Sequence, residues 1–357
     1  MAGTLFDAYL PLVLWTGLGL IAFRFVPQAF PRLLGRVLYW VGVPWQILAL
    51  ARQTDYAQTI GLAPAVTIAA LVLGLLLAWL SLQAYQQWLT QPAQSQLAQL
   101  QPAQSQTSQQ LLSSVTSGLS DAATIDSFDE PLPTESTTVG LNRSQRGSFI
   151  LAATIGNTGF VGLGLVPALI SQPYVGWAVF YSVTHNIVGT YGVGVFLASY
   201  YGLSRQQNHW WVQLRDVLSV PSLWAFTIGS LTRSMEASDA IEQGLHASLY
   251  FVIPGAFLLM GMRLSQLHGW QSIQFALLPT VLKVIILPLA VGLGTTLLGL
   301  SGDARLALVL MAGMPSAFAG LILAEEYDLD REVIASSIAL STIALLFTIP
   351  LWLLLFR

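Results

Sequence analysis

The sequence predicts an all-α membrane protein of ten transmembrane helices, arranged as two inverted five-helix repeats with the fourth and ninth helices broken. Three observations support this fold class. Of the 357 residues, 54% are hydrophobic and only 9% are charged, whereas a soluble domain carries about 25% charged residues. Many apolar runs reach about 20 residues, enough to cross a hydrocarbon core of about 30 Å. Finally, prolines and glycines recur between the two halves at constant offsets.

The first half contains five apolar runs that we interpret as spans. The first run has Asp7 as its first charge and Arg24 after it, so it lacks the cationic start of a signal peptide and we expect it to be retained as a span. The predicted spans of this half are residues 5–25, 33–51, 57–82, 146–169 and 175–200.

The second half contains five further apolar runs. Glu325 and Glu326 close the fourth of these runs, and Glu332 lies at the start of the fifth. The predicted spans are residues 213–232, 243–263, 273–299, 304–325 and 332–356.

A polar segment rich in Gln, Ser, Thr and Pro separates the third and fourth spans. It contains the hexamer QPAQSQ twice, at 91–96 and 101–106. It has too little apolar area to offset the entropy of ordering, so we expect it to be disordered. The predicted organisation is helices 1–3 of the first repeat in residues 1–83, a disordered linker in 84–143, helices 4–5 in 144–204, and the second repeat in 205–357.

The distribution of basic residues predicts the orientation, because cytoplasmic loops are enriched in Lys and Arg. With both termini outside, nine arginines face the cytoplasm and four face the exterior. The nine are Arg24, Arg32, Arg36, Arg143, Arg146, Arg205, Arg215, Arg263 and Arg331, and the four are Arg52, Arg233, Arg305 and Arg357. We therefore expect a multi-pass protein of the inner (plasma) membrane, with the linker in the cytoplasm.

An internal repeat relates the two halves. Pro11, Gly19 and Pro44 match Pro221, Gly229 and Pro254 at an offset of 210. Residues 157–163 (NTGFVGL) are echoed by residues 315–321 (PSAFAGL) at an offset of 158, and the difference of 52 is about the length of the linker. Five spans per repeat is an odd number, so the second copy must enter the membrane inverted. Two broken helices at matching places are typical of carriers with a mid-membrane substrate site.

Three segments resemble the auxin efflux carrier family, which includes plant PIN-type exporters and bacterial carriers for malate- or malonate-like acids. They are RGSFILAATIGNTGFVGLGL (146–165), MPSAFAGLILAEEY (314–327) and SSIALSTIALLFTIP (336–350). The resemblance implies a prokaryotic member with ten helices in two inverted repeats, in which broken helices four and nine cross. Two features depart from the family. Gly164 stands where proline is common, and the linker joins helices three and four instead of five and six.

A broken helix exposes backbone N–H groups at the positive end of a helix dipole, which suits a carboxylate. By resemblance, Asn157 would hydrogen-bond the substrate carboxylate, and Thr158 and Gly159 would supply backbone contacts. The matching end, shaped by Pro315, Ser316 and Ala317, would come from the ninth helix. The alternative is that these small residues only permit close helix packing.

Polar residues elsewhere in the spans are further candidates. Asn186 and His185 would contact substrate or, for His185, carry a proton; the alternative for both is a hydrogen bond to a neighbouring helix. Lys283, the one basic residue well inside a span, would balance an anionic substrate or brace the transport domain, or it would snorkel to an interface. Weaker candidates for substrate contact are Gln46, Tyr39 and Tyr181.

Several classes of function are disfavoured. The chain has no cysteine and a net charge of −3, and it shows no His-rich metal spacing, phosphate-binding loop or catalytic triad, so we expect no metal, no cofactor, no nucleic-acid partner and no enzymatic activity. No carboxylate lies at mid-membrane as a proton or sodium relay. The sequence therefore predicts a secondary transporter that moves a small organic anion, such as a carboxylate or auxin-like acid, by alternating access. The alternatives are a non-transporting sensor of a similar acid and a channel, and a homodimer stays open.

Overall fold

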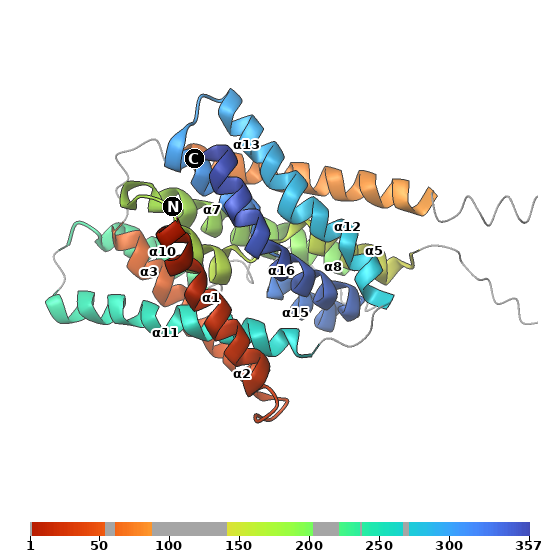
Figure 1. Ribbon diagram of the computed structural model, residues 1–357, viewed down its shortest axis with the longest axis horizontal. Coiled ribbons are helices and arrows are strands. Elements are labelled where there is room, and N and C mark those ends of the chain that lie inside the picture. The colour runs from red at the N-terminus through yellow and green to blue at the C-terminus, as the bar shows by residue number, and fades with distance from the viewer. Residues whose placement is uncertain (1, 54–60, 88–140, 203–220, 236–237, 267–270) are drawn as a thin grey trace, which may run out of the picture. The chain divides into compact units, whose positions relative to one another are not determined.

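The computed structural model describes residues 2–53, 61–87, 141–202, 221–235, 238–266 and 271–357 (Figure 1). These residues are helical throughout and contain no strand, apart from one isolated backbone pair between Gly156 and Ser316. Contacts divide the chain into one unit of residues 1–79 and 143–357 and a second unit of residues 80–142. The predicted disorder of the linker, the repeated hexamer and the span at 213–220 fall outside the described residues.

The first half begins with three apolar helical segments. The second of these contains a π-helical turn, and the third runs to Gln87, so residues 84–87 are helical although their composition placed them in the linker. The segments are α1 (Ala2–Ala22), α2 (Phe30–Val37), the π-helix η1 (Leu38–Gly42), α3 (Val43–Gln53) and the helix Leu62–Gln87.

The rest of the first half is more interrupted. It comprises α5 (Arg143–Thr154), the π-helix η2 (Thr158–Gly162), α6 (Leu163–Leu165), the short 3₁₀ turns η3 (Val166–Ala168) and η4 (Gln172–Tyr174), α7 (Val175–Thr184), the π-helix η5 (His185–Gly194) and α8 (Val195–Tyr201).

The second half contains longer helices and one further interruption. Its elements are α10 (Pro221–Thr232), α11 (Asp239–Leu264), α12 (Gln271–Val281), the π-helix η6 (Leu282–Ile286), α13 (Leu287–Leu297), α14 (Gly302–Ala312), α15 (Phe318–Tyr327) and α16 (Arg331–Phe356).

Five helices are long and apolar enough to cross a membrane, so the chain is a multi-pass membrane protein. They are Phe30–Arg52, Leu62–Gln87, Asp239–Leu264, Ile273–Leu297 and Arg331–Phe356. The other predicted spans are shorter or interrupted over the described residues. The predicted count of ten spans in an inverted repeat stays a prediction.

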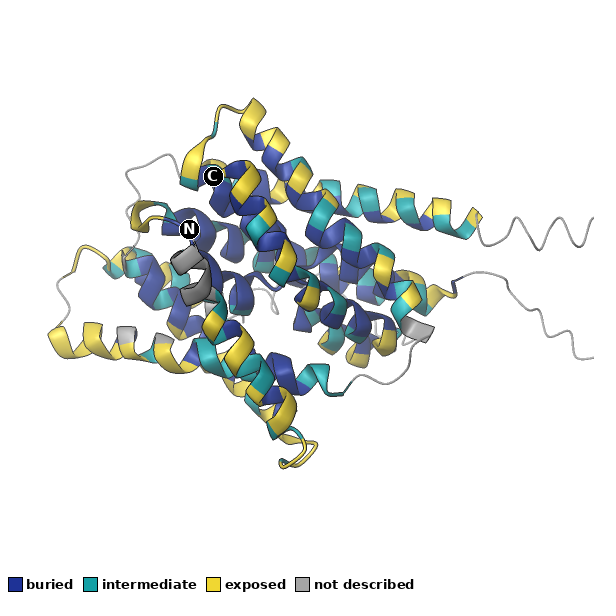
Figure 2. Cartoon of the chain, viewed as in Figure 1, coloured by how far each residue is buried: buried dark blue, intermediate teal, exposed yellow. Residues whose placement is uncertain are grey.

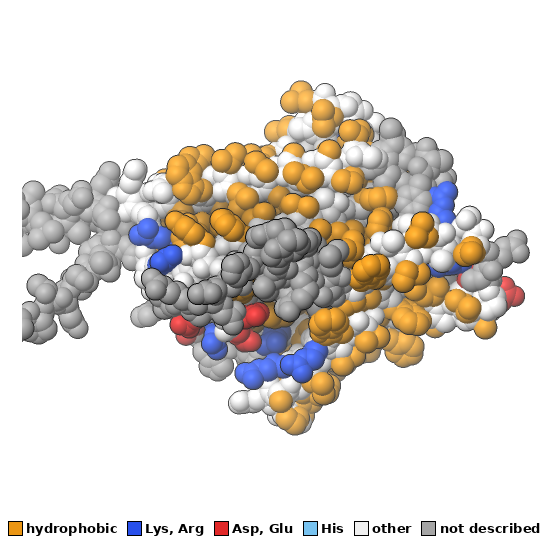
Figure 3. Space-filling view, turned by 180° about the vertical axis from the view of Figure 1, so that it is seen from behind, with side chains coloured by type: hydrophobic (Ala, Val, Ile, Leu, Met, Phe, Trp, Pro, Cys, Tyr) orange, Lys and Arg blue, Asp and Glu red, His pale blue; other side chains and the backbone are white. Residues whose placement is uncertain are grey.

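Large apolar side chains lie on the outside of the helical unit of residues 1–79 and 143–357. Tyr250, Phe251 and Leu297 expose 80%, 78% and 89% of their surface, and hydrophobic side chains cover much of the face in Figure 3. By contrast, eight of the eleven residues of α14 are buried, and buried positions face neighbouring helices in Figure 2. A helix that is apolar on all sides and buried belongs to the interior, so α14 is an inner helix surrounded by lipid-facing ones.

Glycines allow two pairs of helices to approach closely. A Cβ atom on Gly19 of α1 would lie 2.1 Å from the carbonyl oxygen of Leu258 in α11, and one on Gly261 would lie 2.0 Å from that of Thr16. Helix α1 therefore packs backbone against backbone on α11 (Figure 1). In the same way, a Cβ on Gly229 of α10 would lie 2.9 Å from the carbonyl oxygen of Leu48 in α3. Such small-residue contacts are typical of helix pairs in membranes.

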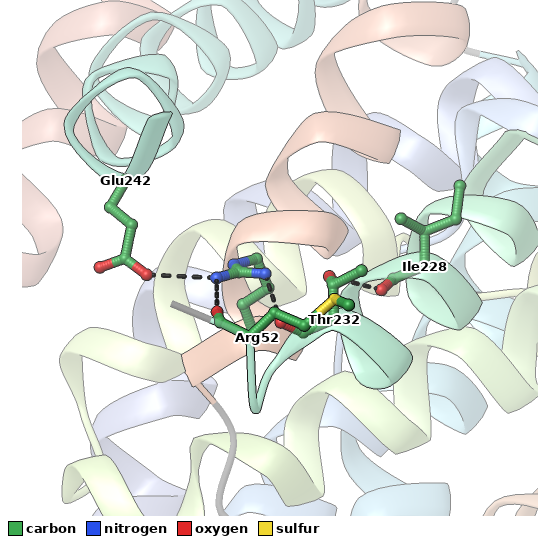
Figure 4. Close-up of polar contacts among 5 residues, drawn as sticks. Arg52, Ile228, Thr232 and Glu242 are labelled. Carbon is green, nitrogen blue, oxygen red and sulfur yellow. Dashed lines mark hydrogen bonds and ion pairs between the residues drawn. The ribbon is translucent and has the colours of Figure 1, made fainter. Parts of the chain in front are cut away.

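Arg52 joins the ends of three helices (Figure 4). Its guanidinium donates to the carbonyl oxygens of Thr232 at 2.6 Å and Met235 at 3.0 Å, and it pairs with Glu242 at 3.2 Å. The last carbonyls of a helix lack partners within the helix and carry partial negative charge. Arg52 at the end of α3 therefore caps α10 and holds it to the start of α11.

Candidate functional site

Two helix interruptions meet in the interior. Helix α5 ends at Thr154 before η2 begins at Thr158, and α14 ends at Ala312 before α15 begins at Phe318. The backbone N–H of Asn157 donates to the carbonyl of Pro315 at 2.7 Å, and that of Ala317 donates to the carbonyl of Ile155 at 2.9 Å. Backbone groups freed by a break in the membrane need partners inside the protein. Here each break supplies partners for the other, as an antiparallel pair centred on Gly156 and Ser316.

Asn157 is the N-cap of the segment that follows the first break. Its side-chain Oδ1 accepts from the N–H of Phe160 at 3.3 Å, which is the usual role of asparagine at a helix start. Its side chain is buried, with 5% exposed. Because the cap occupies Oδ1, the Nδ2 group, a donor, is the part of the side chain that an anion can use.

A chain of polar side chains runs from the break along α7 and η5. Ser182 Oγ donates to Thr158 Oγ1 at 3.4 Å, Asn186 Nδ2 lies 3.4 Å from Ser182 Oγ, and Thr190 Oγ1 lies 3.5 Å from Asn186 Oδ1. A Cβ on Gly159 would lie 3.5 Å from Asn186 Nδ2. The structure thus brings Asn186 to the break. Sequence reasoning missed Ser182 and Thr190, although their spacing of four residues from Asn186 places all three on one helix face.

His185 supports the first break from the side. Its Nε2 accepts from the N–H of Gly156 at 3.3 Å, and its Nδ1 has no partner among the described residues. A nitrogen that accepts carries no proton, so this contact assigns the proton of the neutral ring to Nδ1. Tyr181 stacks on the ring with centroids 6.1 Å apart. Tyr181 is therefore a neighbour of the residue that supports the break.

Lys283 lies at the meeting point of the two breaks. Its side chain is 1% exposed, and its Nζ donates to the carbonyl of Ala312, the last residue of α14, at 2.6 Å. A Cβ on Gly156 would lie 2.8 Å from Nζ, so a larger residue there would displace the end of the Lys283 side chain. No carboxylate pairs with Lys283 within the described ranges. Its charge is partly balanced by the negative end of α14.

The second break is held by its own polar contacts. Ser316 Oγ donates to the carbonyl of Ala152 at 2.8 Å, and its backbone N–H donates to Ser341 Oγ at 3.0 Å. The carbonyl of Pro315 and the N–H of Ala317 take part in the pairing of the breaks. The residues predicted from the ninth span therefore build the junction. Ser341 of α16 was missed because nothing local in the sequence indicates its partner.

Gln46 is buried in α3 with 1% exposed, and neither polar atom of its amide has a hydrogen-bond partner in the described ranges. Val43, one turn earlier on this helix, lies 3.6 Å from a Cβ placed on Gly159. The side chain of Tyr39 lies outside the described residues. In the parts of the chain that the structure describes, no group of three His, Asp or Glu residues is arranged to hold a metal ion.

Comparison with known proteins indicates the family. The sequence model of a family described as "Membrane transport protein" matches residues 219–353. An uncharacterized transporter of Methanothermobacter thermautotrophicus is 27% identical over 214 residues, which cover 60% of this chain and 69% of that protein. The uncharacterized transporter MJ1031 of Methanocaldococcus jannaschii is 23% identical over 217 residues, which cover 59% and 69% of the two chains. These matches confirm, at the level of the family, the resemblance found in the sequence motifs.

Proposed function

We propose that this chain, whose residues 219–353 match the sequence model of a membrane transport protein family and which is similar to archaeal transporters, is a secondary transporter that moves a small organic anion, such as a carboxylate or an auxin-like acid, by alternating access. The observation that carries the proposal is the buried Lys283 beside two paired helix breaks. An ammonium group without a carboxylate partner in the membrane interior is costly, and such groups mark ion and substrate pathways.

Three groups at the break favour an anion. Lys283 supplies positive charge, Asn157 supplies its Nδ2 donor, and α15 starts at Phe318 with its positive dipole end at the junction. We propose that these groups bind the substrate carboxylate close to Thr158 and Gly159. Asn186, Gln46, His185 and Tyr181 would line the remainder of the site, while Pro315, Ser316 and Ala317 hold its second side.

The packing of the helices supports the inverted-repeat architecture. The first predicted span (α1) packs on the seventh (α11), and the sixth (α10) packs on the second (α2–α3). The matched glycines Gly19 and Gly229 lie at these two contacts. The fourth and ninth spans bond to each other at their breaks. Reciprocal pairing of this kind is expected when two repeats are related by a two-fold axis, and we propose that the breaks cross on that axis.

The test exploits the two roles of Asn157. The variant Asn157→Asp keeps an acceptor for the N–H of Phe160, and Asp is as good an N-cap as Asn. It removes the Nδ2 donor and adds a negative charge beside the substrate. Counterflow in proteoliposomes with labelled mono- and dicarboxylates should show uptake by the wild type and at least a tenfold loss in Asn157→Asp, with an unchanged melting temperature.

The companion variant Asn157→Ala loses the cap and should cost about 1 kcal/mol of stability as well as uptake. Wild-type uptake in Asn157→Asp would refute the site. Saturable binding of an acid without any flux would favour the sensor, and no binding of any acid would refute the proposed substrate class.

A further inference from the structure

Gln46 is a buried amide whose hydrogen-bonding groups are unused. Its side chain is 1% exposed, and neither Nε2 nor Oε1 has a partner among the described residues. It lies within the apolar span Phe30–Arg52. Burying an amide without compensating hydrogen bonds costs about 1–3 kcal/mol by protein mutational data. Such a group needs a partner that the described part of the chain does not supply.

The amide lies on the inward side of α3. Val43, Ile47 and Leu50 on this side are buried in the main core, whereas neighbouring Trp45 is 46% exposed. Helix α10 contacts α3 elsewhere, through Leu48 and Ala51 against Gly229. Gln46 therefore faces neither the lipid nor the α10 contact.

This side of α3 is the side that meets the first break. Val43 contacts the position of Gly159, which also adjoins Asn186 Nδ2. Gln46 follows Val43 by three residues, so it lies close to the same helix face and about 4.5 Å further along the axis. The proposed carboxylate site and the unpaired amide are thus neighbours along one face of one helix.

The helix packing does not itself require an amide. At the offset of 210 that matches Pro44 with Pro254, the second half carries Ala256, which is also buried, with 3% exposed. The corresponding position on α11 thus packs with a small apolar side chain. The amide is a feature of the first half alone.

We propose that Gln46 is a specificity-determining residue and that the substrate carries an O–H or N–H donor in addition to its carboxylate. This rests on the proposed transport function. A primary amide offers two donors and one acceptor. A carboxylate only accepts, so a plain carboxylic acid leaves Oε1 unpaired. An acid with a hydroxyl or a ring N–H satisfies Oε1 while its anionic end binds at Asn157 and Lys283.

The test uses pairs of acids of similar shape that differ in the donor. The pairs are malate and succinate, lactate and propionate, and indole-3-acetate and 1-naphthaleneacetate. Competition against counterflow in proteoliposomes should show that the wild type prefers the donor-bearing acid of at least one pair by roughly tenfold or more, since a site built for a hydrogen bond rejects analogues that lack it.

The variant Gln46→Met keeps the length of the side chain and removes its polar groups. The preference for the donor-bearing acid should fall below about threefold. The melting temperature should stay equal or rise, because the variant no longer buries an unpaired amide. Trp45→Leu, at the exposed neighbouring position, is the matched control and should keep the wild-type preference. If Gln46→Met does not insert into the membrane, Gln46→Asn takes its place. This variant shortens the side chain by one carbon and should also weaken the preference.

The outcomes separate the two proposals. The role of Gln46 is overturned if the wild type transports acids without preference, or if the Gln46 variant keeps the wild-type preference. Either outcome leaves the transport function standing. Absence of transport and binding for all six acids overturns both.

Discussion

At the scale of single residues, the candidate site combines a buried lysine with a glycine beside it. Gly156 leaves space for the ammonium group of Lys283, which donates to the carbonyl of Ala312. The Oδ1 atom of Asn157 caps the following segment, and its Nδ2 group is left as a donor. The residues that we propose to bind the substrate are therefore also residues that maintain the breaks.

The variant Lys283→Met separates the binding role of Lys283 from a structural one. It keeps the apolar stem and loses both the charge and one hydrogen bond. Replacing a buried charge by an apolar group of similar volume is often neutral or stabilising, whereas losing the bond costs about 1–3 kcal/mol. We expect thermal unfolding in detergent to change by less than about 2 kcal/mol and anion uptake to be lost. Normal uptake would show that Lys283 braces the fold without contacting substrate.

Motifs in the sequence predicted much of this residue set but not its partners. Asn157 and Pro315 were found because they interrupt apolar runs, which is a local signal. Ser341 and Ala152 hold Ser316 from segments far away in the sequence, and no local pattern indicates such a contact. The pairing of His185 with the backbone of Gly156 was likewise beyond sequence reasoning.

At the scale of helices, close approach depends on particular glycines. Helix α11 carries Gly261, where a Cβ would lie 2.0 Å from the carbonyl oxygen of Thr16, and Gly244, which has no atom within 4 Å of a Cβ. Both positions lie within one helix (Asp239–Leu264). They make a matched pair for measuring what the α1–α11 contact contributes.

Gly261→Ala should lower the melting temperature, because α1 must move away from α11 to admit the methyl group and an overpacked contact costs about 1–3 kcal/mol. Gly244→Ala should raise stability by about 0.5–1 kcal/mol, since alanine favours a helix over glycine. Thermal unfolding in detergent compares the two variants. Equal effects would mean that the close contact of α1 and α11 is not maintained in solution.

Element boundaries were predicted less well than elements. Apolar length identified the helices, but the helix Leu62–Gln87 continues through residues that composition assigned to the linker. The π-helical segments η1, η5 and η6 were not anticipated, because an extra residue in a turn leaves no mark in hydropathy. Such segments are frequent at functional sites, and η5 and η6 carry His185 and Lys283.

At the scale of the whole molecule, the orientation in the membrane is a prediction from arginine placement. The chain contains no cysteine, so single cysteines report their side of the membrane without background. Gln28→Cys and Ser301→Cys, both at exposed positions, should react with an impermeant maleimide from the cytoplasmic and the external side, respectively. The reverse pattern would mean that both termini lie in the cytoplasm.

The hydrogen bond between Asn157 and Pro315 also bears on how the protein is made. The two residues are 158 positions apart, so at about 5–20 residues per second the ribosome needs roughly 8–30 s to produce the second after the first. During that interval the N–H of Asn157 and the carbonyl of Ile155 face the bilayer or the insertion machinery without their final partners. The first half must therefore be sheltered until the second half has been synthesised. We expect the two halves to fold when they are co-expressed and neither half to fold when it is synthesised alone.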